Sequence, residues 1–93
     1  MRHVIVRCQA ASSFFGVFVS RKGREVVLKD ARRLWHWKGA ASLSQLAVSG
    51  TSDPGSCKFP ASVKRVELLD AIEVMDMTPA AIKSLSGVPV WKM

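Results

Sequence analysis

Residues 14–29 read FFGVFVSRKGREVVLK, and this stretch decides the fold. β-branched and aromatic residues dominate 14–20 and 25–29, a composition typical of strands. The tetrapeptide between them is strongly polar, and Gly23 supplies the positive φ that a tight chain reversal requires. We therefore predict a β-hairpin, with Gly16 as a bend or bulge in its first strand.

Further strands are expected on both sides of this hairpin. Residues 3–7 are rich in β-branched side chains and predict a strand whose two faces are both partly covered, joined to the hairpin by the small polar residues 9–13. Residues 63–77 form the longest β-like stretch, which is longer than a usual strand, so we expect a bend or break near Leu69-Asp70. Its core candidates are Val66, Leu68, Ile72 and Val74.

Two short helices have clear boundaries. Ser42 is a good N-cap, and a glutamine three positions later completes a capping box. The apolar stripe of this helix is Leu43, Leu46 and Ala47, and Gly50 ends it. Thr78 followed by Pro79 starts a second helix, which ends at Gly87 and Pro89 and turns Ile82 and Leu85 inward. Between the two helices, residues 51–60 hold a glycine and two prolines and predict a surface loop.

The segment 30–37 fits two structures. As a strand it places Arg33, Trp35 and Trp37 on one face, with Arg32, Leu34, His36 and Lys38 on the other. As a helix it is capped by Asp30 and aligns Leu34 with Trp37. The bulky and aromatic content favours the strand.

These elements describe one domain over residues 1–93 with an α+β fold. We expect a small, strongly bent antiparallel sheet of about five strands with two short helices, or an SH3-like or Sm-like barrel. The pattern Gly16-x-x-x-Ser20 through Val26-x-Leu28-x-Asp30-Ala31 resembles the second and third strands of such barrels. Trp91, near the end of the chain, is expected to dock on the body or on a neighbouring subunit.

Charge is distributed unevenly along the chain. Residues 1–38 hold nine Lys and Arg and two acidic residues, whereas residues 39–93 hold five of each, so the net charge of +7 belongs to the first 38 residues. A basic region of this kind indicates an anionic partner, such as a nucleotide or nucleic acid.

The end of that basic region reads RRLWHWK at residues 32–38. Arginine recognises phosphate and indole stacks on bases, so Arg32 or Arg33 with Trp35 or Trp37 predicts a nucleotide-binding site. The other candidate contacts are His36, Lys38 and Arg24, the last in the hairpin turn. The alternative interpretation buries one indole in the core and leaves the arginines on a solvated rim.

Other classes of function have little support. The sequence contains no phosphate-binding glycine loop, dinucleotide fingerprint or zinc pattern, so we expect neither an enzyme nor a cofactor nor a metal site. Cys8 and Cys57 match no metal or redox spacing and are expected to be reduced thiols. The longest uncharged stretch, 39–52, is too short to span a membrane, and no secretory signal precedes it, which predicts an intracellular protein.

A wider stretch, 26–50, contains ARRLWHWKGAASLSQLA and resembles a family of small bacteriophage and prophage proteins classed as a domain of unknown function. The resemblance implies a phage origin and a place in the host cytoplasm, but no activity. Some phage proteins of this size sequester nucleotide signals of host defence. By that analogy we expect a non-catalytic homo-oligomer that binds a nucleotide-type ligand.

Two other functions remain open. The same residues could form an open surface that binds RNA or single-stranded DNA. They could also anchor a protein–protein inhibitor of a host factor, since Trp and Arg dominate the binding energy of such interfaces.

Overall fold

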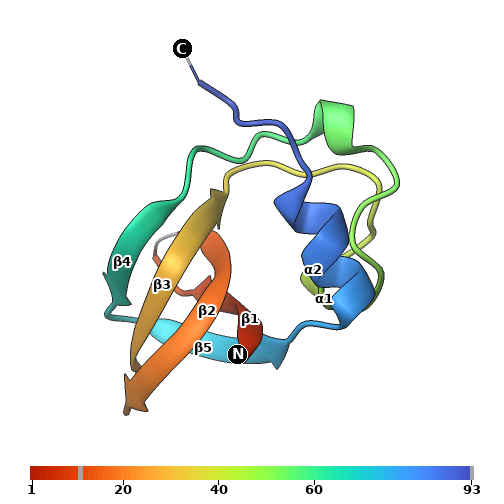
Figure 1. Cartoon of the computed structure of the whole chain (residues 1–93). Coiled ribbons are helices and arrows are strands. Elements are labelled where there is room, and N and C mark those ends of the chain that lie inside the picture. Colours follow the sequence, from red (N-terminus) through yellow and green to blue (C-terminus); the bar gives the residue numbers. More distant parts are fainter. Residues whose placement is uncertain (11, 93) are drawn as a thin grey trace.

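The computed structural model describes residues 1–10 and 12–92, and in this part of the chain the fold consists of five strands and two α-helices (Figure 1). The strands are β1 (His3–Cys8), β2 (Ser13–Lys22), β3 (Glu25–Leu34), β4 (Val63–Leu68) and β5 (Ala71–Asp76). The helices are α1 (Leu43–Ser49) and α2 (Pro79–Ser86), and one 3-10 turn lies at Pro54–Ser56. The predicted α+β class, hairpin and order of elements are confirmed.

The sheet is antiparallel throughout, with the strand order β4-β3-β2-β1-β5. β4 and β5 are therefore its two edges. They are neighbours in the chain, and the predicted break at Leu69-Asp70 separates them. Within the described residues no ladder joins β4 to β5, so the sheet is bent but open and the barrel alternative is not confirmed.

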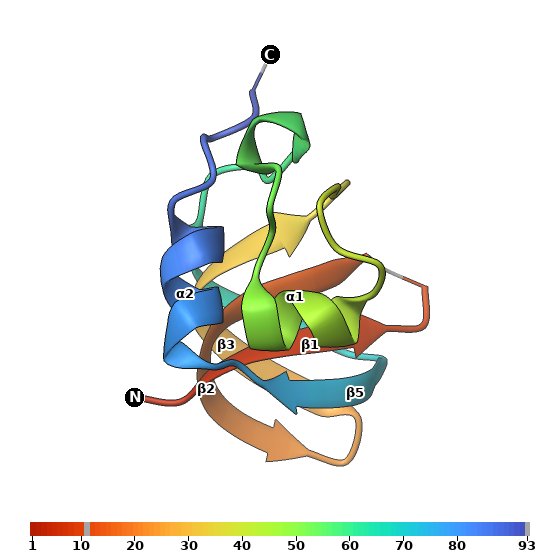
Figure 2. The ribbon, with the colours of Figure 1, turned by 90° about the vertical axis from the view of Figure 1, so that its right-hand side faces the viewer.

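Two apolar clusters lie on opposite faces of the sheet. One is built from strand residues alone, including Val6, Phe14 and Leu28, because the bent sheet folds over itself. The other lies between the sheet and the two helices, and includes Phe15 and Leu46. Figure 2 shows both helices in front of the strands. β1 contributes to both clusters, which confirms that both of its faces are covered.

The segment 30–34 is extended, as the sequence favoured, but the strand ends at Leu34 rather than continuing to residue 37. Asp30 has a positive φ of 49°, a conformation that aspartate tolerates better than most residues, and the β2–β3 register shifts at this point. The bulge keeps Ala31 buried on the strand-only side of the sheet.

Two predictions about burial are wrong. Ile72 is 41% exposed rather than in the core, because the β1–β5 register shifts at Arg7/Cys8 and the alternation of side chains is lost there. The segment 51–60 is a surface loop only in part, since Phe59 is fully buried and packs edge-on against Phe15 with ring centroids 5.8 Å apart.

Both helix starts are confirmed. The Ser42 hydroxyl accepts from the Gln45 N–H at 3.2 Å, and the Gln45 side chain accepts from the Ala41 N–H at 2.8 Å. Thr78 accepts from the Ala81 N–H at 3.1 Å. These caps fix where each helix meets the sheet, and they leave the segment between β3 and α1 to form the site described below.

Gly16 is required where β2 crosses β3, because a Cβ there would lie 2.9 Å from the Cα of Ala31. We expect Gly16→Ala to lower the free energy of unfolding by about 1–3 kcal/mol through this overlap. Gly55→Ala is the matched control, because its Cβ would meet nothing within 4 Å. Urea unfolding measures both, and equal stability of the two variants would contradict the close approach.

Candidate nucleic-acid interface

The predicted site residues follow one another at the end of β3, yet the structure sends their side chains in different directions. Beyond Leu34 the chain forms an isolated antiparallel bridge between His36 and Lys58. On the other side of this segment, Phe59 forms a parallel bridge with Val90, and the Trp91 N–H donates to the Phe59 carbonyl at 3.0 Å. Three chain segments that are distant in sequence thus lie side by side at this end of the molecule.

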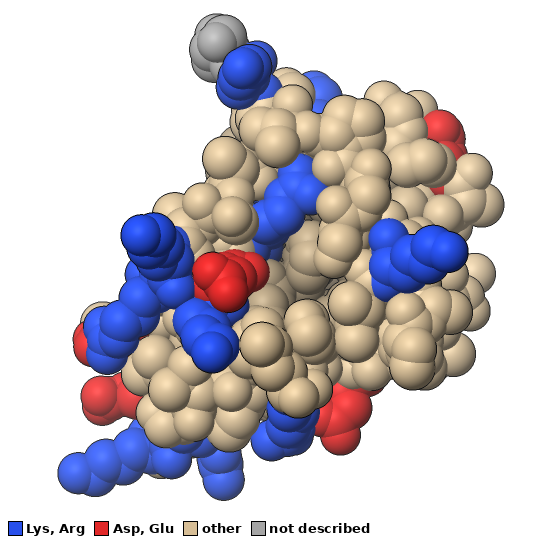
Figure 3. All heavy atoms as spheres, viewed as in Figure 1, with Lys and Arg blue, Asp and Glu red and all other residues tan. Residues whose placement is uncertain are grey.

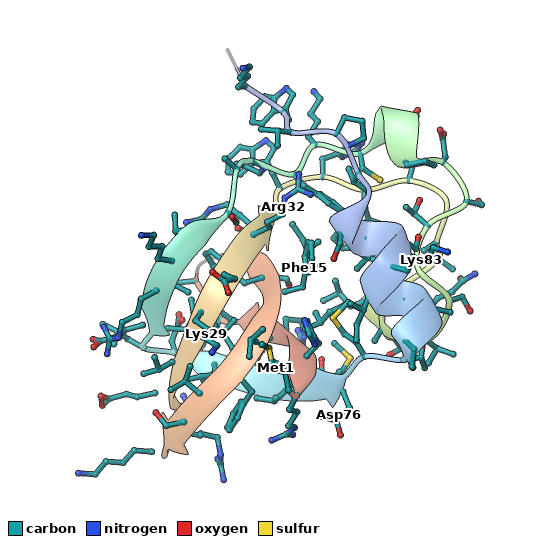
Figure 4. All side chains as sticks on the ribbon, in the orientation of Figure 1. Met1, Phe15, Lys29, Arg32, Asp76 and Lys83 are labelled. Atoms are coloured by element: carbon teal, nitrogen blue, oxygen red, sulfur yellow. The ribbon has the colours of Figure 1, made fainter. Side chains whose placement is uncertain are left out.

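Arg32 is enclosed by backbone carbonyls. Its side chain points from β3 toward the end of α2, above Phe15 (Figure 4), and the residue is only 8% exposed. Nε donates to the Pro60 carbonyl at 3.0 Å, Nη1 to Val88 at 2.9 Å and Nη2 to Phe59 at 2.8 Å. Longer contacts reach the carbonyls of Leu85 (3.5 Å) and Pro89 (3.4 Å).

A guanidinium has five N–H donors, and the five carbonyls match that number. Burial lowers the pKa of Arg32 from its ordinary value, as expected for a cation held away from water. The prediction that Arg32 binds phosphate therefore does not fit the structure, because the fold itself occupies its donors.

Arg33 lies on the opposite face of the sheet from Arg32. Its guanidinium carbon sits 4.4 Å from the ring centroid of Phe14, and Nη1 donates to the Ser12 hydroxyl at 2.8 Å. This side chain is half-buried, and it lies on the opposite side of the sheet from the cluster that Trp37 packs against. Among the described residues the contacts of the Arg33 guanidinium are thus with Phe14 and Ser12, and the predicted clamp with Trp37 is not formed.

Trp37 packs against the cluster between the sheet and the helices, alongside Ala40 and Leu43. The predicted alignment of Arg33, Trp35 and Trp37 on one face is wrong, because regular alternation stops where β3 ends. The alternative interpretation, in which one indole belongs to the core, is correct for Trp37. The side chain of Lys38 is exposed nearby, while its carbonyl accepts from the Thr51 hydroxyl.

Trp35 remains exposed and stacks on Trp91. The two indoles are nearly parallel, with an interplanar angle of 12° and ring centroids 6.3 Å apart. Trp35 is 57% and Trp91 37% exposed. The ammonium of Lys58 lies 5.6 Å from the ring centroid of Trp91, and His36 is exposed beside it. We call Trp35, His36, Lys58 and Trp91 the tryptophan edge.

The expectation that Trp91 docks on the body of the protein is confirmed, but its partner was not foreseen. Lys58 was missed altogether, since it stands alone in a loop segment with no motif around it. The one signal nearby was Phe59, because phenylalanine is among the residue types most often fully buried.

Figure 3 shows where lysine and arginine side chains gather on one face of the molecule: over the end of the sheet that holds the β2–β3 turn, and again beside the C-terminal end. Arg24, the remaining predicted site residue, lies in the β2–β3 turn and is exposed. It therefore lies far along the sheet from Trp35. The salt bridges of the described residues involve Arg2, Arg7 and Arg65 only.

Both cysteines and three of the acidic residues make contacts within the fold. Burial, followed by the nearby Asp70 carboxylate and a hydrogen bond to it, raises the pKa of the Cys8 thiol to about 11. Cys57 is also free and buried, in the other cluster. Glu73 and Asp76 pair with arginines across the β1–β5 ladder, each at 2.7 Å.

No three His, Cys, Asp or Glu side chains of residues 1–10 and 12–92 lie close enough together to hold a metal ion. In the same residues, no helix has the length and apolar character needed to cross a membrane.

Residues 1–85 match the family model described as a domain of unknown function, DUF6948. The chain belongs to this family. No curated protein and no solved structure matches the chain. The DUF6948 match includes Arg32, Trp35 and Lys58, whereas Trp91 follows it.

The hydrogen bonds from Arg32 to backbone carbonyls are expected to contribute to the stability of the folded protein. Replacing Arg32 with methionine leaves the carbonyls of Pro60, Val88 and Pro89 without a donor. Each loss costs about 1–3 kcal/mol, so we expect the free energy of unfolding to fall by at least about 3 kcal/mol. Urea unfolding followed by tryptophan fluorescence measures the loss. Arg33→Met is the matched control, with an expected loss of about 1 kcal/mol for its one hydroxyl contact. A smaller loss for Arg32→Met than for Arg33→Met would contradict the structural role.

Proposed function

We propose that this protein binds single-stranded nucleic acid, without catalysis, through the tryptophan edge. The observation that carries the proposal is the exposed stack of Trp35 on Trp91. Two nearly parallel indoles offer a flat apolar face on which a base can stack, and stacking accepts every base because each has a π-face.

Charge supports the same partner. Lys58 lies next to the indole of Trp91. His36 and Lys38 follow Trp35 in the chain, Lys92 follows Trp91, and all three are exposed. A nucleic-acid strand placed with one base on Trp35 or Trp91 would bring its phosphates near these cations. The net charge of +7 favours association with a polyanion in general.

An open surface favours a strand over a compact nucleotide. A small ligand is usually enclosed in a concave pocket. Two cavities, of about 500 Å³ and 390 Å³, lie elsewhere, one at the β2–β3 turn and the other beside the N-terminus, and neither is lined by the tryptophan edge. This is why we favour RNA or single-stranded DNA over a sequestered nucleotide signal.

The resemblance of residues 31–47 to small bacteriophage and prophage proteins supports a phage origin and a role in the host cytoplasm. In that setting the proposed ligand is phage or host single-stranded nucleic acid.

The test measures binding of fluorescein-labelled oligothymidylates of increasing length by fluorescence anisotropy. We expect affinity to rise with length and to fall steeply with salt, by about 0.7 in logarithmic slope for each phosphate contacted. Trp35→Ala removes one stacking face, worth about 1–3 kcal/mol, and should weaken binding about tenfold or more, whereas Trp35→Phe should keep most of the affinity.

Lys58→Ala should reduce the salt slope, and Lys83→Ala on α2 is its matched control, since both residues are exposed lysines. Unchanged binding by Trp35→Ala would contradict the proposal. It would also be contradicted if a cyclic dinucleotide raised the melting temperature while long oligonucleotides did not, because a compact ligand would then be the partner.

A further inference from the structure

A groove of about 500 Å³ lies between the β2–β3 turn and β5. One wall is the turn, with Arg21, Gly23 and Arg24, and the other is the first part of β5, from Ala71 to Val74. The turn lies at the end of the molecule opposite the C-terminus in both ribbon views (Figures 1 and 2). The groove is therefore separate from the tryptophan edge.

The β5 wall is a free sheet edge. In the described residues β5 pairs with β1 alone. The Met77 N–H donates to the His3 carbonyl on the β1 side at 3.0 Å. N–H directions alternate along a strand, so the Val74 N–H faces away from β1. Such an edge can accept another extended chain through main-chain hydrogen bonds.

One contact shows that backbone can approach this edge. The Ala71 N–H donates to the Arg24 carbonyl at 3.0 Å, at the point where the turn meets β5. Further along β5 the two walls diverge into the groove. Ile72, 41% exposed, lies in this part, and Leu69 is exposed just before it. Exposed aliphatic side chains beside a free edge favour a peptide over a simple anion.

The charge of the groove is positive. The guanidinium of Arg21 is held over the turn by a 3.0 Å hydrogen bond from Nη1 to the Gly23 carbonyl, and Arg24 is exposed. Neither arginine takes part in a salt bridge among the described residues. Glu73, the one acidic residue of the lining, is already paired with Arg7 at 2.7 Å. Carboxylates on an incoming segment would meet two available arginines.

We propose that this groove binds an extended acidic segment of a partner protein, which adds to the sheet as a strand along β5. Main-chain hydrogen bonds to β5 supply the affinity, Arg21 and Arg24 select acidic side chains, and Ile72 contacts an aliphatic one. A nucleic-acid strand would use the arginines but neither the strand edge nor Ile72.

The test uses three acetylated, amidated six-residue peptides as probes. The first alternates glutamate and valine, the second replaces each glutamate with lysine, and the third is the first with proline at its central valine. Binding to the ¹⁵N-labelled full chain is followed by NMR. We expect the acidic peptide to shift the amides of Gly23 and residues 72–74, the lysine peptide to shift neither, and the proline peptide to bind at least about tenfold more weakly, because proline removes a ladder donor.

Arg24→Ala should weaken the acidic peptide about tenfold, the loss of one charge-assisted hydrogen bond, while Lys83→Ala leaves it unchanged. Both residues are exposed, so an unchanged melting temperature confirms that the variants fold. The proposal is overturned if the acidic peptide produces no shifts at millimolar concentration, or if the lysine peptide binds as well. Shifts confined to the tryptophan edge would overturn it too. Trp35→Ala, which tests the nucleic-acid proposal, should leave peptide binding unchanged.

Discussion

The hydrogen bonds of the Arg32 guanidinium hold together three parts of the chain that the sheet alone would not connect. They join β3 to the carbonyls of Phe59 and Pro60 and to those that follow α2, at Val88 and Pro89. Such a buried cation is tolerated because all of its donors find acceptors. With these segments fixed, the Trp91 N–H can reach the Phe59 carbonyl, and its indole can lie on Trp35.

The most basic and aromatic stretch of the chain therefore serves two purposes. Arg32 and Trp37 turn inward and stabilise the packing of the helices and the C-terminal segment on the sheet. Trp35 turns outward and, with Trp91, forms a flat exposed face. The position of that face depends on the buried arginine, so a change at Arg32 would disturb binding through the fold and not through a lost contact with the ligand. For mutations in this stretch, an effect on folding has to be distinguished from an effect on contact with the ligand.

The sequence predicted the elements whose ends are set by local chemistry. Ser42 and Thr78 cap helices through their own hydroxyls, and the break at Leu69-Asp70 follows from the length of the β-like stretch. It did not predict what depends on pairing between distant segments. The bulge beside Ile72 and the end of β3 at Leu34 upset a simple alternation, and the burial of Arg32 depends on carbonyls more than 25 residues away in sequence. In the same way, Lys58 and Trp91 belong to the candidate site because three segments that are distant in sequence lie side by side in the structure.

The central claim is that Arg32 and Trp37 belong to the fold while Trp35 and Trp91 face the ligand. One NMR titration of the ¹⁵N-labelled protein with an oligothymidylate tests it, because the three indole N–H groups and the Arg32 Nε–H give separate side-chain signals. We expect the Trp35 and Trp91 indole signals to shift in proportion to bound oligonucleotide, and those of Trp37 and the Arg32 Nε–H to stay in place. Shifts of the Arg32 or Trp37 signal with the Trp35 and Trp91 signals unmoved would contradict this account.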